Sequence, residues 1–286
     1  MKYGINITNF GDGFTSNALA DLAHEAEESG WDGFFIWDHL AAFKHSDKQL
    51  LSIIDPWITL AAIAMRTNHI RIGPMVTPVP RRRPWKLARE AVTLDHLSNG
   101  RLNLGVGLGF PDWDEYEQFG ESGNANIRAA KLDEGLDVLL GLWSGRPFNY
   151  NGEFYVVKGA TFHPAPLQVP RIPIWVAGTW PNKKPIRRSA RYDGVFPISS
   201  DLKHDLRVED VKDIAKYVNS HRKEHSHFDI VISGTSINES PEKSIDKITR
   251  LEDAGATWWQ ERFGPWVGSI EDIQKIVWKG PTRSAS

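Results

Sequence analysis

The sequence predicts an α/β protein built as a (β/α)8 TIM barrel with insertions between the fourth and fifth strands. Two observations predict this fold. Short runs of branched, apolar residues alternate with amphipathic stretches, and the alternation is long enough to supply all eight units of a barrel. The runs are apolar on both faces, which is typical of strands in a parallel sheet covered by helices. We expect residues 1–286 to form one domain; a doubly wound open sheet is the alternative.

The predicted elements follow in regular order along the chain. Strands are expected at residues 3–7, 33–37, 70–76, 102–106, 172–176, 194–198, 230–233 and 257–261. Helices, whose apolar residues recur at spacings of three and four, are expected at residues 18–28, 56–66, 85–97, 130–143, 185–191, 208–221, 241–253 and 270–278. Ser240 before Pro241 marks a helix start, and Gly30, Gly100 and Gly255 mark helix ends.

The interval between the fourth and fifth strands is longer than the others. It contains residues 109–125, which are rich in Gly, Asp and aromatic residues. Residues 149–157 then predict a hairpin around Asn151-Gly152, a type I′ turn signal. Pro164, Pro166 and Pro170 follow, and they predict an extended surface segment.

Composition excludes several classes of protein. The chain has 34 Lys+Arg against 36 Asp+Glu, which argues against a nucleic-acid binder. It has no Cys, which excludes a disulfide scaffold, a Cys-ligated metal and a thiol nucleophile. The first residues lack the apolar core of a signal peptide, and the longest apolar stretch, residues 57–65, is too short to span a bilayer. We therefore expect a soluble, cytoplasmic protein with no membrane partner.

The active site of such a barrel lies at the carboxyl ends of the strands. A metal-dependent hydrolase of this fold needs a His-x-His after the first strand, and this strand ends with Asn6, Thr8 and Asn9 instead. His221, His225 and His227 have ligand spacing, but a solvated helix end explains them better. We predict no metal site.

Glycine-rich and basic segments also occur at the predicted strand ends. Gly105, Gly107 and Gly109 do not open a helix, so they are not a dinucleotide fingerprint. They form either a flexible strand exit or a surface that a flat ring approaches closely. The loop expected at residues 177–179 would bind a phosphate-bearing cofactor through its N–H groups. Four cations follow it, which otherwise form an ordinary basic helix face: Lys183, Lys184, Arg187 and Arg188.

Two other features have a structural and a functional interpretation. The basic run at residues 81–83 is more typical of a solvated loop. The chain has 12 Trp, and some of them lie near strand ends, where they would either stack on a planar ligand or pack the barrel. These are Trp37, Trp180, Trp258 and Trp259.

Several segments together resemble the bacterial luciferase-like superfamily. They are residues 30–39 (GWDGFFIWDH), 55–57 (DPW), 70–76 (IRIGPMV), 94–107 (LDHLSNGRLNLGVG), 191–194 (RYDG) and 255–259 (GATWW). The resemblance keeps its order over nearly the whole chain. It implies a TIM-barrel enzyme, commonly a homodimer, of a superfamily that includes flavin-dependent monooxygenases and reductases using the deazaflavin coenzyme F420.

The resemblance also implies roles for individual residues. His39 would be catalytic, through a hydrogen bond to flavin or substrate or by moving a proton, and Asp38 would lie beside the ring; the alternatives are a structural histidine and a loop-capping carboxylate. A strand bulge would fall on Met75 and Val76, behind the flavin. The cofactor-binding residues would be Met75, Val76, Val106, Gly107, Leu108, Gly109, Ala177, Gly178 and Thr179.

One departure from the family pattern favours FMN over coenzyme F420. Several F420-dependent members carry Glu where this chain has Leu108. The leading prediction is a monooxygenase that uses reduced FMN and O2 on a small organic substrate. A separate flavin reductase would supply the reduced FMN. The alternatives are an F420-dependent hydride transfer, a barrel hydrolase and a non-catalytic flavin-binding protein.

The strand–helix loops determine the substrate in this fold. Here they are residues 44–52, residues 110–124 and the segment before Ile172. Aromatic residues in and beside these loops predict a partly apolar substrate pocket; they are Phe43, Phe110, Trp113 and Tyr116.

Overall fold

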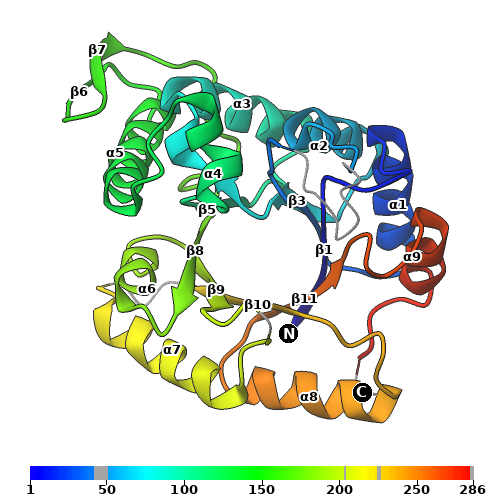
Figure 1. Cartoon of the computed structure of the whole chain (residues 1–286). Coiled ribbons are helices and arrows are strands. Elements are labelled where there is room, and N and C mark those ends of the chain that lie inside the picture. The colour runs from blue at the N-terminus through cyan, green and yellow to red at the C-terminus, as the bar shows by residue number, and fades with distance from the viewer. Residues whose placement is uncertain (42–50, 203, 224–226, 284–286) are drawn as a thin grey trace.

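A computed structural model describes residues 1–41, 51–202, 204–223 and 227–283, and its parallel strands form the predicted barrel (Figure 1). The strands of the ring are β1 (Lys2–Ile7), β2 (Gly33–Ile36), β3 (Arg71–Pro74), β4 (Thr77–Pro78), β5 (Leu104–Gly107), β8 (Ile174–Trp180), β9 (Gly194–Ser199), β10 (Asp229–Gly234) and β11 (Trp258–Phe263). Their spatial order is β3-β2-β1-β11-β10-β9-β8-β5-β4.

The ring closes through a strand that is interrupted in the middle. β3 and β4 are separated by Met75 and Val76 and occupy one strand position. Ile72 of β3 forms a parallel bridge with Leu102, and Thr77 of β4 pairs with Val106 of β5. Both halves therefore reach the same neighbour, which confirms the closed barrel over the alternative of an open sheet.

Helices surround this ring, as the alternation predicts (Figure 1). They are α1 (Ser16–Glu28), α2 (Pro56–Arg66), α3 (Pro84–Leu97), α5 (Ala125–Trp143), α6 (Lys183–Ser189), α7 (Val208–His221), α8 (Pro241–Asp253) and α9 (Ile270–Val277). α5 begins before the predicted residue 130 because Asn124 caps it, accepting hydrogen bonds from Asn126 N and Ile127 N. Among the described helices, none has the length and apolarity to cross a membrane.

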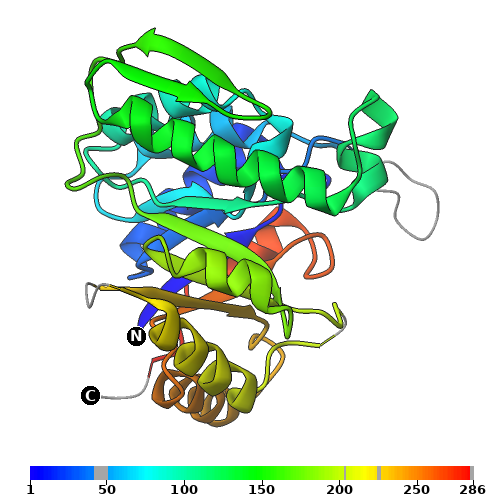
Figure 2. The ribbon, with the colours of Figure 1, turned by 90° about the vertical axis from the view of Figure 1, so that its left-hand side faces the viewer.

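The predicted insertion lies between β5 and β8. It contains α4 (Asp112–Glu115), the 3-10 turn η2 (Glu117–Phe119), α5, and a hairpin of β6 (Phe148–Asn151) and β7 (Val156–Ala160) that lies outside the ring (Figure 2). The hairpin is confirmed, but the two-residue turn at Asn151-Gly152 is wrong, because Asn151 pairs with Val156. The carboxylate of Glu134 on α5 accepts hydrogen bonds from the backbone N–H groups of the intervening loop, those of Glu153, Phe154 and Tyr155. These hydrogen bonds stabilise a loop longer than two residues.

Large side chains fill the interior of the barrel. This inner layer consists of Phe35, Met75, Trp175, Phe196, Val231 and Trp258. The ring of Trp175 lies 5.3 Å from those of Phe35 and Trp258. For Trp258 the packing interpretation is therefore confirmed. Trp259, the next residue, points the other way and packs with the helices.

Residues 94–107, one of the segments that carry the family resemblance, contribute a stabilising residue at the end of the barrel where the strands begin. Arg101 is buried, and its guanidinium donates hydrogen bonds to the carbonyls of Ala64, Thr67 and Ile70, and to that of Ser98. These carbonyls end α2, precede β3 and follow α3. Since carbonyls at helix ends lack partners within the helix, Arg101 joins these elements into one unit.

Candidate active site

A second layer of inward-facing side chains lies one step nearer the carboxyl ends of the strands. Alternate residues of a strand face the same side, so this layer follows the inner layer by two residues on most strands. It consists of Trp37, Ala177, Ile198, Ser233 and Gln260, together with Val76 of the interrupted strand. These side chains form the floor of the barrel mouth.

The floor has an apolar part and a polar part. Val76, Ala177 and Ile198 are partly buried and pack on the inner layer. On the β10–β11 side, Gln260 accepts a hydrogen bond from Asn6 at 2.8 Å. Gln260 Nε2 and Ser233 Oγ are buried and have no hydrogen-bond partner within the described part of the chain. Buried polar atoms usually have a partner, so these two are available to a ligand or to water.

The glycines of β5 make room for the interruption between β3 and β4. A Cβ on Gly107 would lie 2.8 Å from Val76 Cγ2, and one on Gly105 would lie 2.4 Å from the carbonyl oxygen of Pro74. The peptide between Met75 and Val76 is cis. The space beside these glycines is therefore occupied by the neighbouring strand, and Val76 presents the surface that a flat ring would meet.

The segment at residues 177–179 is a strand and not the predicted loop. β8 continues to Trp180 because β9 pairs with it as far as Ser199, and α6 begins at Lys183. The pairing of β8 with β5 ends earlier, at Val176. Over residues 177–179 the edge of β8 toward β5 has no strand partner among the described residues, so some of its backbone groups are open to a ligand.

Residues after β5 are held by the insertion. The hydroxyl of Tyr116 donates to the carbonyl of Leu108 at 2.5 Å. Arg128 donates to the carbonyl of Gly109 at 2.8 Å and stacks on the Tyr116 ring, 4.9 Å from its centroid. Gly109 has a φ of +83°, which a larger residue rarely adopts. The position of Leu108 and Gly109 thus depends on α4 and α5.

The residues of the predicted aromatic substrate pocket lie in different surroundings. Phe110 and Trp113 are 60% and 61% exposed at the rim. Tyr116 is buried, and burial raises its pKa, so it supports the loop and does not line a pocket as predicted. Phe43 lies outside the described residues.

Asp38 is held by several donors at once. Its carboxylate accepts hydrogen bonds from Thr77 Oγ1 at 2.7 Å, Arg82 Nη2 at 2.8 Å and Arg81 Nη2 at 2.5 Å. Trp57 Nε1 lies 3.3 Å away. The interpretation of residues 81–83 as a solvated loop is wrong for the first two arginines, whose side chains are 8% and 19% exposed. They are largely withdrawn from solvent because Asp38 pairs with both.

His39 contacts a carboxylate that sequence reasoning missed. Its Nδ1 lies 3.0 Å from Glu115 Oε1. The same oxygen accepts the N–H of Leu40 at 3.1 Å, and Glu115 Oε2 contacts Arg81 Nη1. Glu115 is one of several acidic residues in the sequence DWDEYE, and only the packing of α4 distinguishes it, so the sequence alone gave no signal for it.

Burial keeps His39 neutral. Desolvation lowers the pKa of its imidazole to about 4; nearby Asp38 and Asp114 raise the pKa and Arg81 lowers it. Burial also lowers the pKa of Arg81, against the effect of Asp38, yet an arginine remains charged. The site therefore contains a buried chain of groups that runs from Asp38 through Arg81 and Glu115 to the neutral ring of His39.

Aromatic side chains form one wall beside His39. The His39 ring lies 5.6 Å from that of Trp37 and 5.9 Å from that of Phe10. Trp266, which is 51% exposed, lies 5.9 Å from Trp37. Such a wall offers a planar or apolar reactant a contact surface beside the imidazole.

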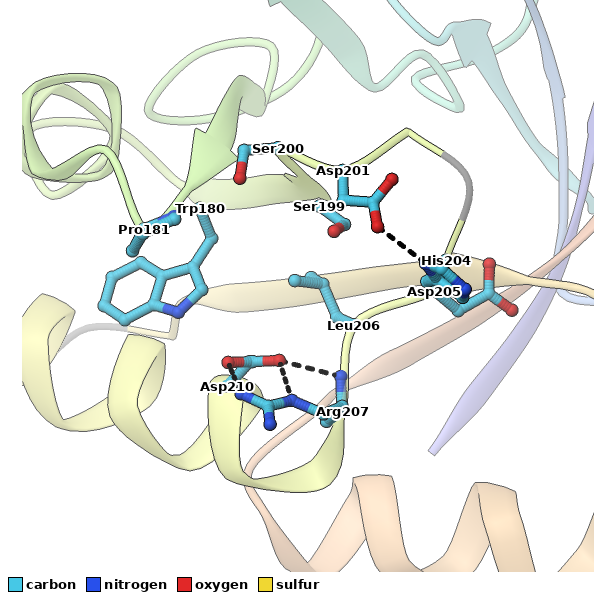
Figure 3. A pocket seen from close by; sticks show the side chains of 10 residues that line it. All are labelled: Trp180, Pro181, Ser199, Ser200, Asp201, His204, Asp205, Leu206, Arg207 and Asp210. Atoms are coloured by element: carbon cyan, nitrogen blue, oxygen red, sulfur yellow. Dashed lines mark hydrogen bonds and ion pairs between the residues drawn. The ribbon is translucent and has the colours of Figure 1, made fainter.

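Two cavities lie at the carboxyl ends of the strands. One, of about 400 Å³, is lined by Asp38, His39, Arg81 and Arg82 among others. The other, of about 440 Å³, lies beyond β8 and β9 and is lined by residues that include Trp180, Ser199 and Asp205 (Figure 3). The structure thus brings Asp38 and His39 to one cavity, while residues 106–109 and 177–179 line neither of these two.

The histidines considered as metal ligands make other contacts. His221 Nδ1 lies 2.8 Å from the carbonyl of Tyr217, and His227 Nε2 lies 2.9 Å from Asp229. His225 is outside the described residues. One group with metal-ligand spacing, His24, Glu27 and Glu28, lies on α1, where Glu27 already accepts backbone N–H groups of residues 68–70.

Comparison with known proteins gives one family. The family model described as luciferase-like monooxygenase matches residues 1–272. An uncharacterized protein of Mycobacterium tuberculosis is 33% identical over 229 residues, which are 75% of this chain and 78% of that protein.

Two further relatives have named activities. The oxygenase component of the flavin-dependent trigonelline monooxygenase of Acinetobacter baylyi is 38% identical over 128 residues, 45% of this chain and 35% of that protein. The F420-dependent glucose-6-phosphate dehydrogenase of Microbacterium testaceum is 34% identical over 182 residues, 63% of this chain and 52% of that protein.

Solved structures share the fold at low sequence identity. An F420-dependent secondary alcohol dehydrogenase in complex with an F420-acetone adduct has a TM-score of 0.76 at 18% identity, over 96% of this chain and 97% of that chain. The oxygenating constituent of 3,6-diketocamphane monooxygenase of Pseudomonas putida in complex with FMN has a TM-score of 0.76 at 17% identity, over 98% of this chain and 96% of that chain.

Proposed function

Because this chain belongs to the luciferase-like monooxygenase family, whose members are oxidoreductases, we propose that it is a flavin-dependent oxidoreductase that binds its reactants at the barrel mouth beside His39. The observation that carries the proposal is the placement of His39 at a cavity of the barrel mouth, with its imidazole 3.0 Å from the buried carboxylate of Glu115. Three buried side chains, those of Glu115, Arg81 and Asp38, hold it at the rim next to an aromatic wall. A structural histidine would not need a cavity beside it.

The residues present at the mouth fit a planar ring with a polar edge. Val76, Ala177 and Ile198 offer an apolar surface for the ring face. Gln260 Nε2 and Ser233 Oγ are buried atoms that need a hydrogen-bond partner. When bound, a flavin or deazaflavin supplies hydride or electron transfer.

The predicted cofactor-binding residues would contribute in different ways. The backbone edges at residues 107–109 and 177–179 would hydrogen-bond the cofactor, and the exposed cations Lys183 and Lys184 of α6 would attract its phosphate. The side chains of Met75 and Val106 are buried in the inner and outer cores, so these two residues would act through their backbone or by supporting the floor.

The first candidate reaction is a monooxygenation with reduced FMN and O2 on a small organic substrate. Leu108 provides no carboxylate at the end of β5, and one relative is named as a flavin-dependent monooxygenase component. The apolar floor and the aromatic wall would exclude water from the reactants. A separate reductase for the flavin and a homodimeric assembly are part of this proposal.

The second candidate is an F420-dependent hydride transfer. A specific observation favours it, because Glu115 brings a buried carboxylate to His39 although Leu108 lacks one. One relative is named as an F420-dependent dehydrogenase. In either reaction His39 would bind the reactant and hold or move a proton, while the aromatic wall would orient the reactant.

Titration of the purified protein with FMN, reduced FMN and coenzyme F420 tests the proposal. Binding of one of them at least about tenfold more tightly than the others is the expected result, and it identifies the cofactor class. Oxygen uptake with reduced FMN and a substrate library then supports monooxygenation. Binding of none of the three at millimolar concentration would overturn the proposed function.

A further inference from the structure

We propose that Glu115 is a positioning residue that keeps a proton on Nδ1 of His39 and thereby makes Nε2 the proton-accepting nitrogen of the ring. The consequence for substrate rests on the proposed function. The state of the imidazole itself does not, since it follows from contacts within the chain.

The first argument is the direction of the hydrogen bond between the two side chains. Glu115 is fully buried, and its carboxylate contacts the Arg81 guanidinium and the N–H of Leu40, both of which are donors. An ion-paired carboxylate only accepts hydrogen bonds. The imidazole nitrogen at 3.0 Å from Oε1 must therefore be the donor. In a neutral ring, a proton on Nδ1 leaves a lone pair on Nε2.

The second argument is that the ring and the carboxylate are both held in place. Asn9 accepts the N–H of His39 at 3.2 Å and donates to its carbonyl at 2.9 Å, which fixes the backbone. Phe10 and Trp37 lie against the ring. On the other side, both oxygens of Glu115 are engaged. Rotation of the imidazole would break its bond to Glu115 without offering that carboxylate an equivalent donor.

The third argument is the balance of charge around the ring. Among the described residues, the charged groups that face it include Asp38, Arg81, Asp114 and Glu115. Arg81 neutralises Glu115 and is itself held by Asp38, so Glu115 does not draw a second proton onto the ring. Burial lowers the pKa of His39 to about 4, and the ring is therefore neutral near pH 7.

This arrangement constrains the chemistry of the substrate. A reactant at Nε2 must present a hydrogen-bond donor, so the substrate class is one with an O–H or N–H at the reacting position. In the proton transfer, that O–H or N–H bond breaks and its electron pair stays on the heteroatom, while an N–H bond forms at Nε2. The resulting imidazolium keeps its Nδ1–H hydrogen bond to Glu115, which holds the ring in the same orientation before and after the transfer.

Nitrogen-15 NMR of histidine-labelled protein at pH 7, without any cofactor, tests the assignment directly. The two ring signals of His39 are identified by their loss in His39→Gln. We expect a protonated Nδ1 and an unprotonated Nε2. A proton on Nε2, alone or together with one on Nδ1, would overturn the proposal.

Variants separate the position of Glu115 from its charge. In Glu115→Ala the acceptor is gone, and we expect the Nδ1 preference to be lost. In Glu115→Gln an amide oxygen can still accept, and we expect the preference to be retained. Glu117→Gln, in which a nearby exposed glutamate is changed, is the matched control and should leave both signals in place. Should Glu115→Ala not fold, the wild-type spectrum still decides.

Kinetics give the functional readout once a cofactor and substrate are known. We expect Glu115→Ala to lower kcat about 10-fold to 100-fold, as when a metal-ligating histidine loses the carboxylate that orients it, with a smaller change in KM and partial recovery in Glu115→Gln. Unchanged kcat in Glu115→Ala would refute the positioning role. Failure of all cofactors to bind, with the NMR result intact, would refute the proposed function alone.

Discussion

Gly107 of β5 lies directly against Val76, and a Cβ on the glycine would come within 2.8 Å of Val76 Cγ2. The contact joins the end of β5 to the interruption between β3 and β4. Packing within the protein therefore explains why β5 carries glycine at position 107.

Gly107→Ala should therefore destabilise the protein by about 1–3 kcal/mol, the usual cost of overpacking. Urea unfolding measures the effect. The double variant Gly107→Ala/Val76→Ala removes the clash and should recover part of the loss, since residues in contact are not additive. Equal stability of Gly107→Ala and wild type would show that Val76 can shift away from position 107 at no cost in stability.

His39→Ala should lower kcat by about 100-fold or more if His39 transfers a proton. The barrel mouth should still bind the cofactor, because the floor residues Val76, Ala177 and Ile198 are untouched. Steady-state rates and cofactor titration, measured on the same preparation, separate the two effects. Loss of cofactor binding with an unchanged rate at saturation would argue against a catalytic role.

Asp38→Ala should destabilise the protein by about 3–5 kcal/mol, because it removes the buried carboxylate that two largely buried arginines share. Chemical unfolding checks this. Asp55→Ala is a comparison, since Asp55 caps α2 through Ile58 N at an exposed position and such a cap contributes about 1 kcal/mol. Similar losses in both variants would mean that the Asp38 cluster adds little to stability.

Arg101→Met should lower the free energy of unfolding by about 2–5 kcal/mol, since four buried carbonyls lose a charged donor. Because these groups lie at the opposite end of the barrel from His39, kcat of the folded variant should stay within about twofold. The matched control is Arg66→Met, which removes an exposed pair with Asp21 worth at most about 1 kcal/mol. A large change in kcat with unchanged stability would contradict this placement.

The low pKa of His39 predicts a pH dependence of stability. The folded-state pKa of about 4 lies below the ordinary value of 6.5, so the unfolded chain binds this proton more tightly. The contribution to stability is present above pH 6.5 and is lost as pH falls toward 4. His39→Gln lacks this contribution, so its stability should fall less over that window than that of wild type. Parallel profiles would show that the imidazole is not desolvated.

The barrel could be predicted from the sequence because the alternation of strands and helices is encoded by residues close together in the chain. Alternating apolar runs and helix caps such as Ser240 act over a few residues. The sequence predicts a loop at residues 177–179 because they follow the apolar run at 172–176 and precede the expected helix, whereas pairing with the neighbouring strand β9 extends β8 through them.

The candidate site was only partly predictable. Asp38 and His39 follow a recognisable strand, so their position at the rim could be read directly. The burial of Arg81 and Arg82 depends on Asp38, which lies far away in the sequence. Glu115 reaches His39 only through the packing of the insertion, with Tyr116 and Arg128 holding the preceding loop. Contacts of this range leave no local pattern.

The insertion after β5 has a further consequence for anyone who alters this protein. The excursion that presents Phe110 and Trp113 at the rim also supplies Glu115 to His39. A chimera that grafts residues 110–124 from a relative would exchange the loop expected to set substrate selectivity and the partner of the imidazole together. Engineering a new substrate preference here should therefore keep Glu115 and redesign only the exposed aromatic positions around it.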